Sequence, residues 1–315
     1  MSPVARPQNS TNVRTKDPYA PARWVLRTTG AVAPPLAAAI AERLFLTAPR
    51  HVRPAWEREV LASAETGSVT MPTGEALPTW TWGDGPTVLL VHGWSGRGSQ
   101  LGAFVPSLVA SGHRVVTFDG PGHGDARAKL ASVVTQARAV NAVMRSLGRV
   151  HAVIAHSVGG ASSVLAASWS PEDVAERYVL VAPPRGPARF VDGFARALAL
   201  SPDVRRQMIA RVEQRYGIAI EALDASQVGA TFARPALVLH DQDDREVPIV
   251  DGKSVAAAIR AELVVTTGLG HRRILRDAAV IERAVRFVSG DGSRPAVTPG
   301  SLEAELYLRD GRSTL

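Results

Sequence analysis

The chain has 315 residues, enough for one large α/β domain with extensions, and its 45% hydrophobic and 21% charged residues exclude a disordered, collagen-like or coiled-coil protein. It contains no cysteine, which excludes disulfides, thiolate metal sites and a cysteine nucleophile. Residues 1–60 hold nine Arg or Lys against four Asp or Glu, so most of the net charge of +7 lies there. The rest of the chain has no run of basic residues interleaved with aromatic residues, so the sequence does not indicate nucleic-acid binding.

The N-terminal 64 residues divide into two segments. Residues 1–30 are predicted to be a disordered basic lead, because their first 22 residues contain four prolines and no hydrophobic periodicity. Residues 31–64 are predicted to be a helical segment, with an amphipathic helix over 35–46. The lead is interpreted as a solvated tail; the alternative is weak peripheral contact with an anionic membrane surface.

The longest apolar stretch, Gly30 to Ile40, is too short to cross a membrane. It is broken by Pro34 and Pro35 and is followed by charged residues, and no cleavage site of a signal peptide follows it. We therefore expect no transmembrane segment and a cytoplasmic location.

Short strands and helices alternate through the body of the chain. Two short strands, 68–71 and 79–82, predict an antiparallel start. The strands that follow are expected at Thr87–Val91, Arg114–Phe118, His151–Ala155, Tyr178–Val181, Ala236–His240 and Leu263–Thr266. The intervening helices are expected at Gly102–Ala110, Ala131–Leu147, Gly159–Ala167, Gly252–Ile259 and Ile274–Val288. Alternating helices and continuously apolar strands predict an α/β fold with a mostly parallel central sheet and helices on both faces. Ligands of such sheets bind at the carboxyl ends of the strands.

An insertion over about 183–234 interrupts this alternation with two helical patterns and is predicted to be a small helical lid. Phe190 and Phe194 in its first helix are predicted to bind substrate. Residues 289–315 continue no α/β unit and are predicted to be a C-terminal extension, which leaves 65–288 as the α/β domain that contains this insertion.

A serine lies where one of these strands turns into a helix. The strand ending at Ala155 is followed by His156, Ser157 and Val158, and then by two glycines that open an Ala-rich helix. Such a turn exposes the serine hydroxyl in a strained conformation, and the small residues around it let strand and helix approach each other. The segment therefore has the pattern of a nucleophile elbow, with Ala155 in place of the usual first glycine; the alternative is an ordinary serine N-cap.

An acid and a histidine follow in the order of a catalytic triad. Asp241, Asp243 and Asp244 come after the strand that ends at His240, and His271 comes after the strand that ends at Thr266. With Ser157, and with further motifs at Val91–Trp94, Phe118–Gly124 and the H-x-x-x-D-x-x-V-P pattern ending at Pro248, the chain resembles the α/β-hydrolase fold superfamily, in its serine hydrolase branch, over roughly residues 65–288.

Each residue receives a role from this reading. Ser157 would attack an acyl carbon after His271 takes its proton. The resemblance implies that Asp244, four residues after His240, orients His271, with Asp241 and Asp243 as rivals. It also implies that the backbone amides of Trp94 and Val158 form the oxyanion hole.

The other histidines are expected to have structural roles. The resemblance implies that His92, His123 and His240 fix loops beside the site, and His156 is expected to pack in the elbow. No metal-ligand spacing connects them, and the glycine-rich loop after His92 lacks the lysine of a phosphate-binding loop, so we expect neither metal nor cofactor.

The predicted function is a carboxylesterase that acts on a small or medium acyl ester. A serine at position 157 argues against haloalkane dehalogenase or epoxide hydrolase chemistry, which uses a carboxylate. An amidase, a thioesterase or a C–C bond hydrolase would use the same triad, and a non-catalytic relative that only binds a partner is the alternative from another class. The substrate and the oligomeric state stay open.

Overall fold

The computed structural model describes residues 19–290. Most of the predicted basic lead and of the C-terminal extension, residues 1–18 and 291–315, lies outside the described residues. The chain forms two compact units. We call them the sheet unit (Thr47–Pro187 and Glu221–Leu315) and the helical unit (Met1–Leu46 and Ala188–Ile220).

The sheet unit is built on eight strands in the order β1-β2-β4-β3-β5-β6-β7-β8. Their bounds are β1 (Glu65–Thr70), β2 (Ala76–Trp82), β3 (Thr87–Val91), β4 (Arg114–Phe118), β5 (Val150–His156), β6 (Arg177–Val181), β7 (Ala236–Asp241) and β8 (Glu262–Thr266). β2 pairs antiparallel with β1 and β4, and every later pair is parallel. The predicted mostly parallel sheet with an antiparallel start is confirmed.

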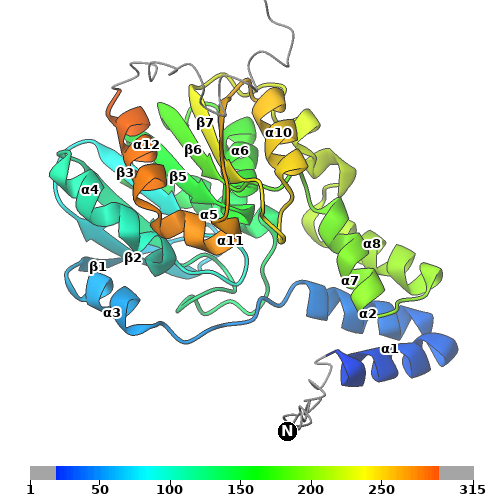
Figure 1. The fold of residues 1–315 in the computed structure, drawn as a ribbon. Coiled ribbons are helices and arrows are strands. Elements are labelled where there is room, and N and C mark those ends of the chain that lie inside the picture. Colours follow the sequence, from blue (N-terminus) through cyan, green and yellow to red (C-terminus); the bar gives the residue numbers. More distant parts are fainter. Residues whose placement is uncertain (1–18, 291–315) are drawn as a thin grey trace, which may run out of the picture. The chain divides into compact units, whose positions relative to one another are not determined.

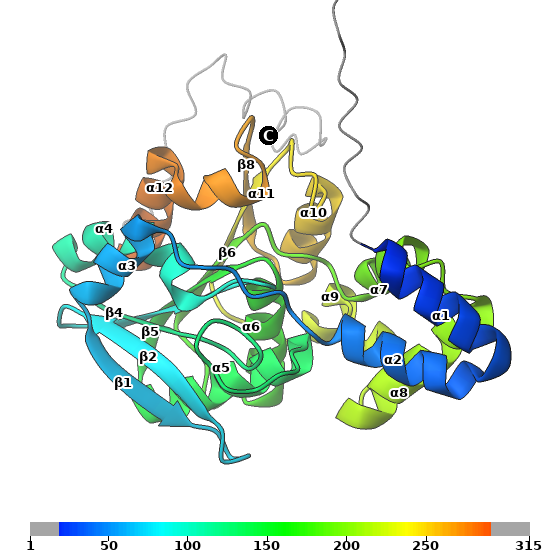
Figure 2. The ribbon, with the colours of Figure 1, turned by 90° about the horizontal axis from the view of Figure 1, so that it is seen from below.

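Helices cover both faces of this sheet, as Figures 1 and 2 show. One face carries η1 (Gly98–Phe104), α4 (Val105–Ala110) and α12 (Ala278–Ser289), with α3 (Ala55–Ala62) against η1. The other carries α5 (Val133–Leu147), α6 (Val158–Trp169) and α10 (Ile249–Ala258), with α9 (Ala225–Val228) beside the last two. The short elements η2 (Glu221–Leu223), α11 (Gly270–Arg273) and η3 (Ile274–Arg276) complete the unit.

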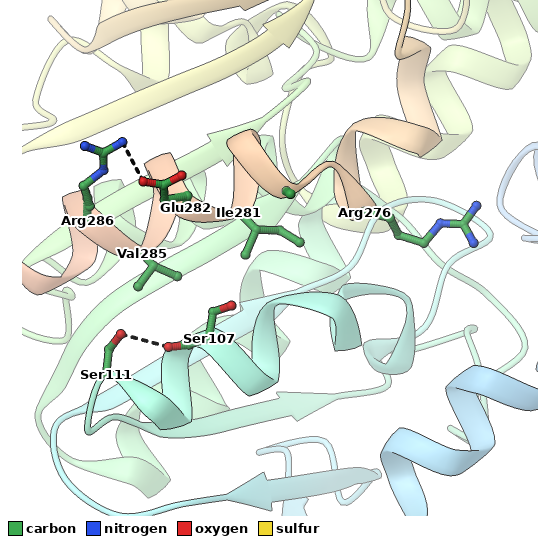
Figure 3. Close-up of a pocket in the computed structure, with 8 residues that line it drawn as sticks. Ser107, Ser111, Arg276, Ile281, Glu282, Val285 and Arg286 are labelled. Carbon is green, nitrogen blue, oxygen red and sulfur yellow. Dashed lines mark hydrogen bonds and ion pairs between the residues drawn. The ribbon is translucent and has the colours of Figure 1, made fainter. Parts of the chain in front are cut away.

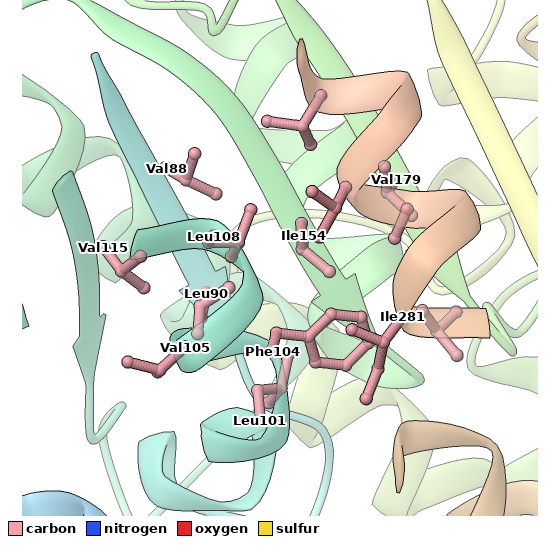
Figure 4. Packing of buried hydrophobic residues seen from close by; sticks show 14 of the residues in the cluster. Val88, Leu90, Leu101, Phe104, Val105, Leu108, Val115, Ile154, Val179 and Ile281 are labelled. Atoms are coloured by element: carbon pink, nitrogen blue, oxygen red, sulfur yellow. The ribbon is translucent and has the colours of Figure 1, made fainter. Parts of the chain in front are cut away.

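The main hydrophobic core lies between the sheet and the layer formed by α4 and α12. Alternate strand residues, such as Val88 and Leu90, point into it, and Phe104 and Ile281 reach it from the helices (Figure 4). Their neighbour Leu89, which alternation directs to the opposite face, is also fully buried. Burial on both faces explains why the strands are continuously apolar in sequence.

The predicted helix over 274–288 is divided in the structure. Residues Ile274–Arg276 form the short η3, and α12 begins only at Ala278. Asp277 separates them because its carboxylate accepts hydrogen bonds from the N–H groups of Ala279 and Val280, both at 3.0 Å, and so caps the second helix.

The helical unit contains α1 (Ala20–Val32), α2 (Pro34–Phe45), α7 (Ala188–Ala197) and α8 (Pro202–Tyr216). Its core joins Leu26 of α1, Ala37 and Ala41 of α2, and Val204 and Met208 of α8. The two helices predicted within the insertion are therefore α7 and α8. Within residues 19–290 no helix has the length and apolar character needed to cross a bilayer.

α1 differs from the predicted lead, because residues 20–30 are helical. The helix begins with Pro21 in its first turn, buries Leu26, and is joined to α7 by a hydrogen bond of 3.1 Å from Arg23 Nη1 to the Ala197 carbonyl. Tertiary contacts therefore stabilise α1. Its outward side also carries apolar residues, so the sequence shows no simple amphipathic period.

Candidate active site

The candidate nucleophile lies at the sharp turn between β5 and α6. Ser157 has φ +53° and ψ −127°, a conformation that is costly for any residue with a side chain. Its N–H donates a hydrogen bond of 2.9 Å to the Val181 carbonyl. A Cβ on Gly159 would come within 2.4 Å of the His92 carbonyl oxygen, so only glycine lets the elbow helix lie this close to the end of β3.

The candidate base and acid are joined directly. Nδ1 of His271 lies 2.6 Å from Oδ2 of Asp244, and both side chains are buried. The other oxygen, Oδ1, accepts hydrogen bonds from the N–H groups of Glu246 at 2.8 Å and Val247 at 2.9 Å. Burial opposes ionisation of Asp244, but these hydrogen bonds, the one from His271 foremost, outweigh it and hold the pKa of the carboxyl below its usual value.

The ionised carboxylate determines the tautomer of His271. A carboxylate only accepts, so Nδ1 carries the proton that points at Asp244, and Nε2 is left with a lone pair. An imidazole in this state can take a proton from a hydroxyl.

The rival acids, Asp241 and Asp243, have other partners. Oδ2 of Asp241 accepts from the Leu269 N–H at 3.0 Å and from the Thr266 hydroxyl at 2.8 Å. Oδ2 of Asp243 accepts from the Gly268 N–H at 2.9 Å. Both carboxylates therefore tie the loop after β7 to the loop after β8, which carries His271.

The two candidate oxyanion amides lie on either side of the elbow. Val158 is the first residue of α6, where an N–H has no acceptor inside the helix. Trp94 follows Gly93, and a Cβ built on Gly93 would come 2.8 Å from Cβ of Ser157, so this loop packs directly on Ser157.

His92 fixes the orientation of the peptide that carries the Trp94 N–H. Its Nε2 accepts from the Gly120 N–H at 2.9 Å, so its Nδ1 is the protonated nitrogen and donates to the Gly93 carbonyl at 2.8 Å. In a trans peptide the N–H points away from the C=O, so holding the Gly93 carbonyl also sets the direction of the Trp94 N–H. Burial lowers the pKa of His92 to about 4, which keeps the ring neutral near pH 7.

A family model described as the alpha/beta hydrolase family matches residues 88–284. The chain belongs to this family. Two relatives are pimeloyl-[acyl-carrier protein] methyl ester esterases. The Methylococcus capsulatus enzyme is 32% identical over 127 residues, 36% of this chain and 49% of the relative, so that match spans about half of the relative's length. The Xanthomonas campestris pv. campestris enzyme is 28% identical over 247 residues, 66% of this chain and 96% of the relative.

A solved structure with the same fold is that of an esterase from Pyrococcus furiosus. It has a TM-score of 0.57 and 17% sequence identity, and the match covers 78% of this chain and 97% of the esterase. At this identity the likeness supports the alpha/beta hydrolase fold alone. The predicted fold class and family resemblance are confirmed.

This alpha/beta hydrolase contains a link between the strand-to-helix turn and the candidate base that the sequence did not indicate. Nε2–H of His156 donates to the backbone carbonyl of His271 at 2.9 Å, and the two rings lie 4.6 Å apart. Burial lowers the pKa of His156 to about 3, so it is neutral. His156, expected only to pack, thus ties the backbone of His271 to the residue that precedes Ser157.

A second unforeseen contact supports the loop that carries Trp94. Arg97 and Glu57 form a buried two-point ion pair, with Nε–Oε2 at 2.6 Å and Nη2–Oε1 at 2.7 Å, and the Ser99 hydroxyl also donates to Glu57. The partners are 40 residues apart, and no local pattern in the sequence connects them.

The predicted loop-fixing role of the remaining histidines agrees with their hydrogen bonds. Nδ1–H of His123 donates to the Pro121 carbonyl at 2.9 Å, and Nε2–H of His240 donates to the Val247 carbonyl at 2.8 Å. In the part of the chain that the structure describes, no three His, Asp or Glu side chains are grouped so that they could hold a metal ion.

The residues predicted to bind substrate lie in the helical unit. Phe194 is half-buried and packs edge to face on Phe45, with ring centroids 5.2 Å apart, and Phe190 is half-buried on the same helix. Their contact with substrate stays a prediction.

Within the sheet unit, a cavity of about 310 Å³ lies between α4 and α12 (Figure 3). Ile281 and Val285 form its apolar side, and Arg286 pairs with Glu282 at its rim. No residue of the candidate triad lines it.

Proposed function

We propose that this alpha/beta hydrolase is a serine esterase that cleaves a small or medium acyl ester through Ser157, His271 and Asp244. The observation that carries the proposal is the 2.6 Å pair of Asp244 and His271, whose backbone carbonyl is bonded by His156, the residue that precedes the strained Ser157 at φ +53°. A hydroxyl is a weak nucleophile unless an adjacent base removes its proton, and this arrangement supplies the base.

The acylation step uses groups of the chain alone. As Oγ of Ser157 attacks the ester carbonyl carbon, Nε2 of His271 takes the hydroxyl proton, and the electron pair of the C=O bond moves onto the oxygen. The backbone N–H groups of Trp94 and Val158 stabilise that oxyanion, and the Asp244 carboxylate stabilises the imidazolium. The oxyanion then collapses, the C–O bond to the alcohol breaks, and His271 protonates the leaving oxygen.

Deacylation repeats these roles with water as the nucleophile. His271 takes a proton from water as its oxygen attacks the acyl carbon of the Ser157 ester. The second oxyanion collapses, the bond to Oγ breaks, and the proton on Nε2 returns to Ser157. The products are a carboxylic acid and an alcohol, and no cofactor takes part.

The printed names of the two curated relatives, both methyl ester esterases, favour an ester as the substrate. An amidase, a thioesterase or a C–C bond hydrolase would use the same groups and is tested by the leaving group. Nucleic acid is not proposed as a partner, and the cytoplasmic location stays a prediction.

Labelling with a fluorophosphonate probe tests the proposal. We expect intact-mass analysis to show one adduct, absent from Ser157→Ala and present in Ser95→Ala, a matched control on the neighbouring loop. A panel of p-nitrophenyl esters, thioesters and anilides should then show ester cleavage that Ser157→Ala abolishes. An adduct on another serine would refute the assignment of the nucleophile, and no adduct together with no turnover would favour the non-catalytic alternative.

A further inference from the structure

Exposed large hydrophobic side chains are concentrated in the first two helices. Of the eleven such side chains in the described part of the chain, six lie between residues 19 and 46. These six are Tyr19, Trp24, Val25, Val32, Leu36 and Leu44. Scattered exposed hydrophobics are normal on a protein surface, whereas a local group of them indicates an interaction site.

Three of the six, Trp24, Val25 and Val32, lie on one side of α1. Leu26 faces the core of the helical unit, and Trp24, Val25 and Val32 face away from it, with 63%, 37% and 88% of their surface exposed. We call these three side chains, with Thr28 and Ala31, the outer face of α1. α1 packs on α2, and α2 packs on α8 (Figure 2). The side chains of the outer face are all exposed.

The one polar side chain on the outer face needs no water. The hydroxyl of Thr28 lies 3.0 Å from the Trp24 carbonyl and 3.1 Å from the Val25 carbonyl and donates back into the helix. A polar group that is satisfied internally can enter an apolar environment at little cost.

The edge of the outer face and the unit behind it are cationic. Arg27 is exposed at this edge, and Arg23, one turn earlier, donates to the Ala197 carbonyl of α7. The described residues of the helical unit contain nine Arg and no Lys, against four acids, a surplus of five positive charges. Glu42, a buried acid of the helical unit, is itself paired with Arg211 and Arg215.

We propose that the outer face of α1 binds the surface of an anionic lipid bilayer. A tryptophan with an apolar body and a polar N–H fits the boundary between headgroups and acyl chains, and the two valines add apolar area beside it. Arg27 and the surplus charge of the unit are attracted to lipid phosphates. This proposal rests on the helical unit and does not depend on the esterase activity.

Two other occupants are less well matched to this face. The segment 1–18, which precedes α1, has only Met1, Val4 and Val13 as large aliphatic side chains, too few to cover a tryptophan and two valines. A second copy of the chain would bring a second cationic unit against the first, which opposes association at low salt.

Flotation of the full-length protein with vesicles tests the proposal. We expect binding to phosphatidylcholine vesicles that contain phosphatidylglycerol, weaker binding to pure phosphatidylcholine, and weaker binding at high salt. Trp24→Ser should raise the lipid concentration for half-maximal binding by about tenfold or more. Arg27→Glu should raise it by about fivefold or more.

Matched controls are available in the sheet unit. Trp169, 38% exposed on α6, and Arg138, exposed on α5, provide Trp169→Ser and Arg138→Glu, which should bind as the parent does. Turnover of a water-soluble acetate ester should be the same in Trp24→Ser and the parent, so the failure of this proposal is distinguishable from that of the esterase proposal.

Three outcomes would overturn the proposal. The first is no flotation with anionic vesicles at low salt. The second is equal binding by Trp24→Ser and Trp169→Ser. The third is that the triple variant Arg6→Gln, Arg14→Gln, Lys16→Gln does not bind while Trp24→Ser still binds. This result would assign the attraction to the basic lead. If Trp24→Ser instead dissociates a dimer and no vesicle binding is seen, the occupant is a second copy.

Discussion

The exchange of Asp244 for asparagine tests the proposed triad, because it replaces one carboxylate oxygen with an NH₂ group. In the parent, Oδ1 of Asp244 accepts two backbone N–H groups and Oδ2 faces Nδ1 of His271. In Asp244→Asn the carbonyl oxygen must keep the Oδ1 place, because an NH₂ group there would face two N–H donors. The NH₂ group is therefore directed at His271.

An NH₂ group in this place reverses the tautomer of the base. Nδ1 must accept the new donor, so the proton moves to Nε2, which can then no longer take a proton from Ser157. In serine hydrolases this change lowers kcat by about 10⁴-fold, which corresponds to about 5.5 kcal/mol of activation free energy. The shape of the side chain is unchanged, so we expect the variant to stay folded at the assay temperature.

The assay is kcat for a p-nitrophenyl ester at saturating substrate, with circular dichroism to confirm folding. The controls are Asp241→Asn and Asp243→Asn, whose carboxylates bind the Thr266 to Leu269 segment and not the imidazole. Both should lose far less activity. If Asp241→Asn is inactive while Asp244→Asn keeps near-normal kcat, the orienting acid is misassigned and the tautomer argument fails.

Three further expectations follow from the structure. Ser157→Gly should be inactive but more stable to urea than Ser157→Ala by about 1 kcal/mol, because glycine accepts φ +53° without strain; equal stability would show that the turn is not strained. Burial lowers the pKa of His92 to about 4 and those of His123 and His156 to about 3. Unfolded histidine has a pKa of about 6.5, so the three neutral rings contribute fully to stability above that pH. As the pH falls from there toward the folded pKa values of about 3 to 4, the contribution is lost at up to about 4 kcal/mol per pH unit for the three together. Urea titrations that give the same unfolding free energy at pH 7 and pH 5 would contradict this. Phe194→Ala should change the preference for acyl-chain length more than the turnover of an acetate ester, while a uniform loss across chain lengths would indicate that Phe194 only packs on Phe45.

The ends of the strands could be predicted from the sequence because a sheet covered on both faces requires apolar strands. Strands buried on both faces must be apolar throughout, so each run stops where the chain leaves the sheet, and the residues that follow lie at the carboxyl edge. This argument selects Ser157, His271 and the group of aspartates as candidates. The choice among three aspartates within four residues depends on side-chain directions in one turn, and only the resemblance to a family pointed to Asp244.

Contacts between distant residues could not be read in the same way. The hydrogen bond from His156 to the backbone of His271 spans 115 residues, and the pair of Arg97 with Glu57 spans 40. No periodicity or motif encodes such a pair. α1 was missed for a related reason: one side packs in a small core and the other side is also apolar, so the two-sided pattern that reveals a surface helix is absent.

The three candidate catalytic residues follow β5, β7 and β8, and β8 forms one margin of the sheet, paired with β7 alone. Most of β8 is only half-buried, in contrast to the fully buried β7. Strands at a margin open more easily than those at the centre, and such opening needs less free energy than global unfolding. Detachment of β8 would carry the loop of His271 away from Ser157 while the other seven strands stay paired. In rising denaturant, catalysis is therefore expected to disappear before the bulk of the secondary structure, so that loss of activity measures the local stability of this margin.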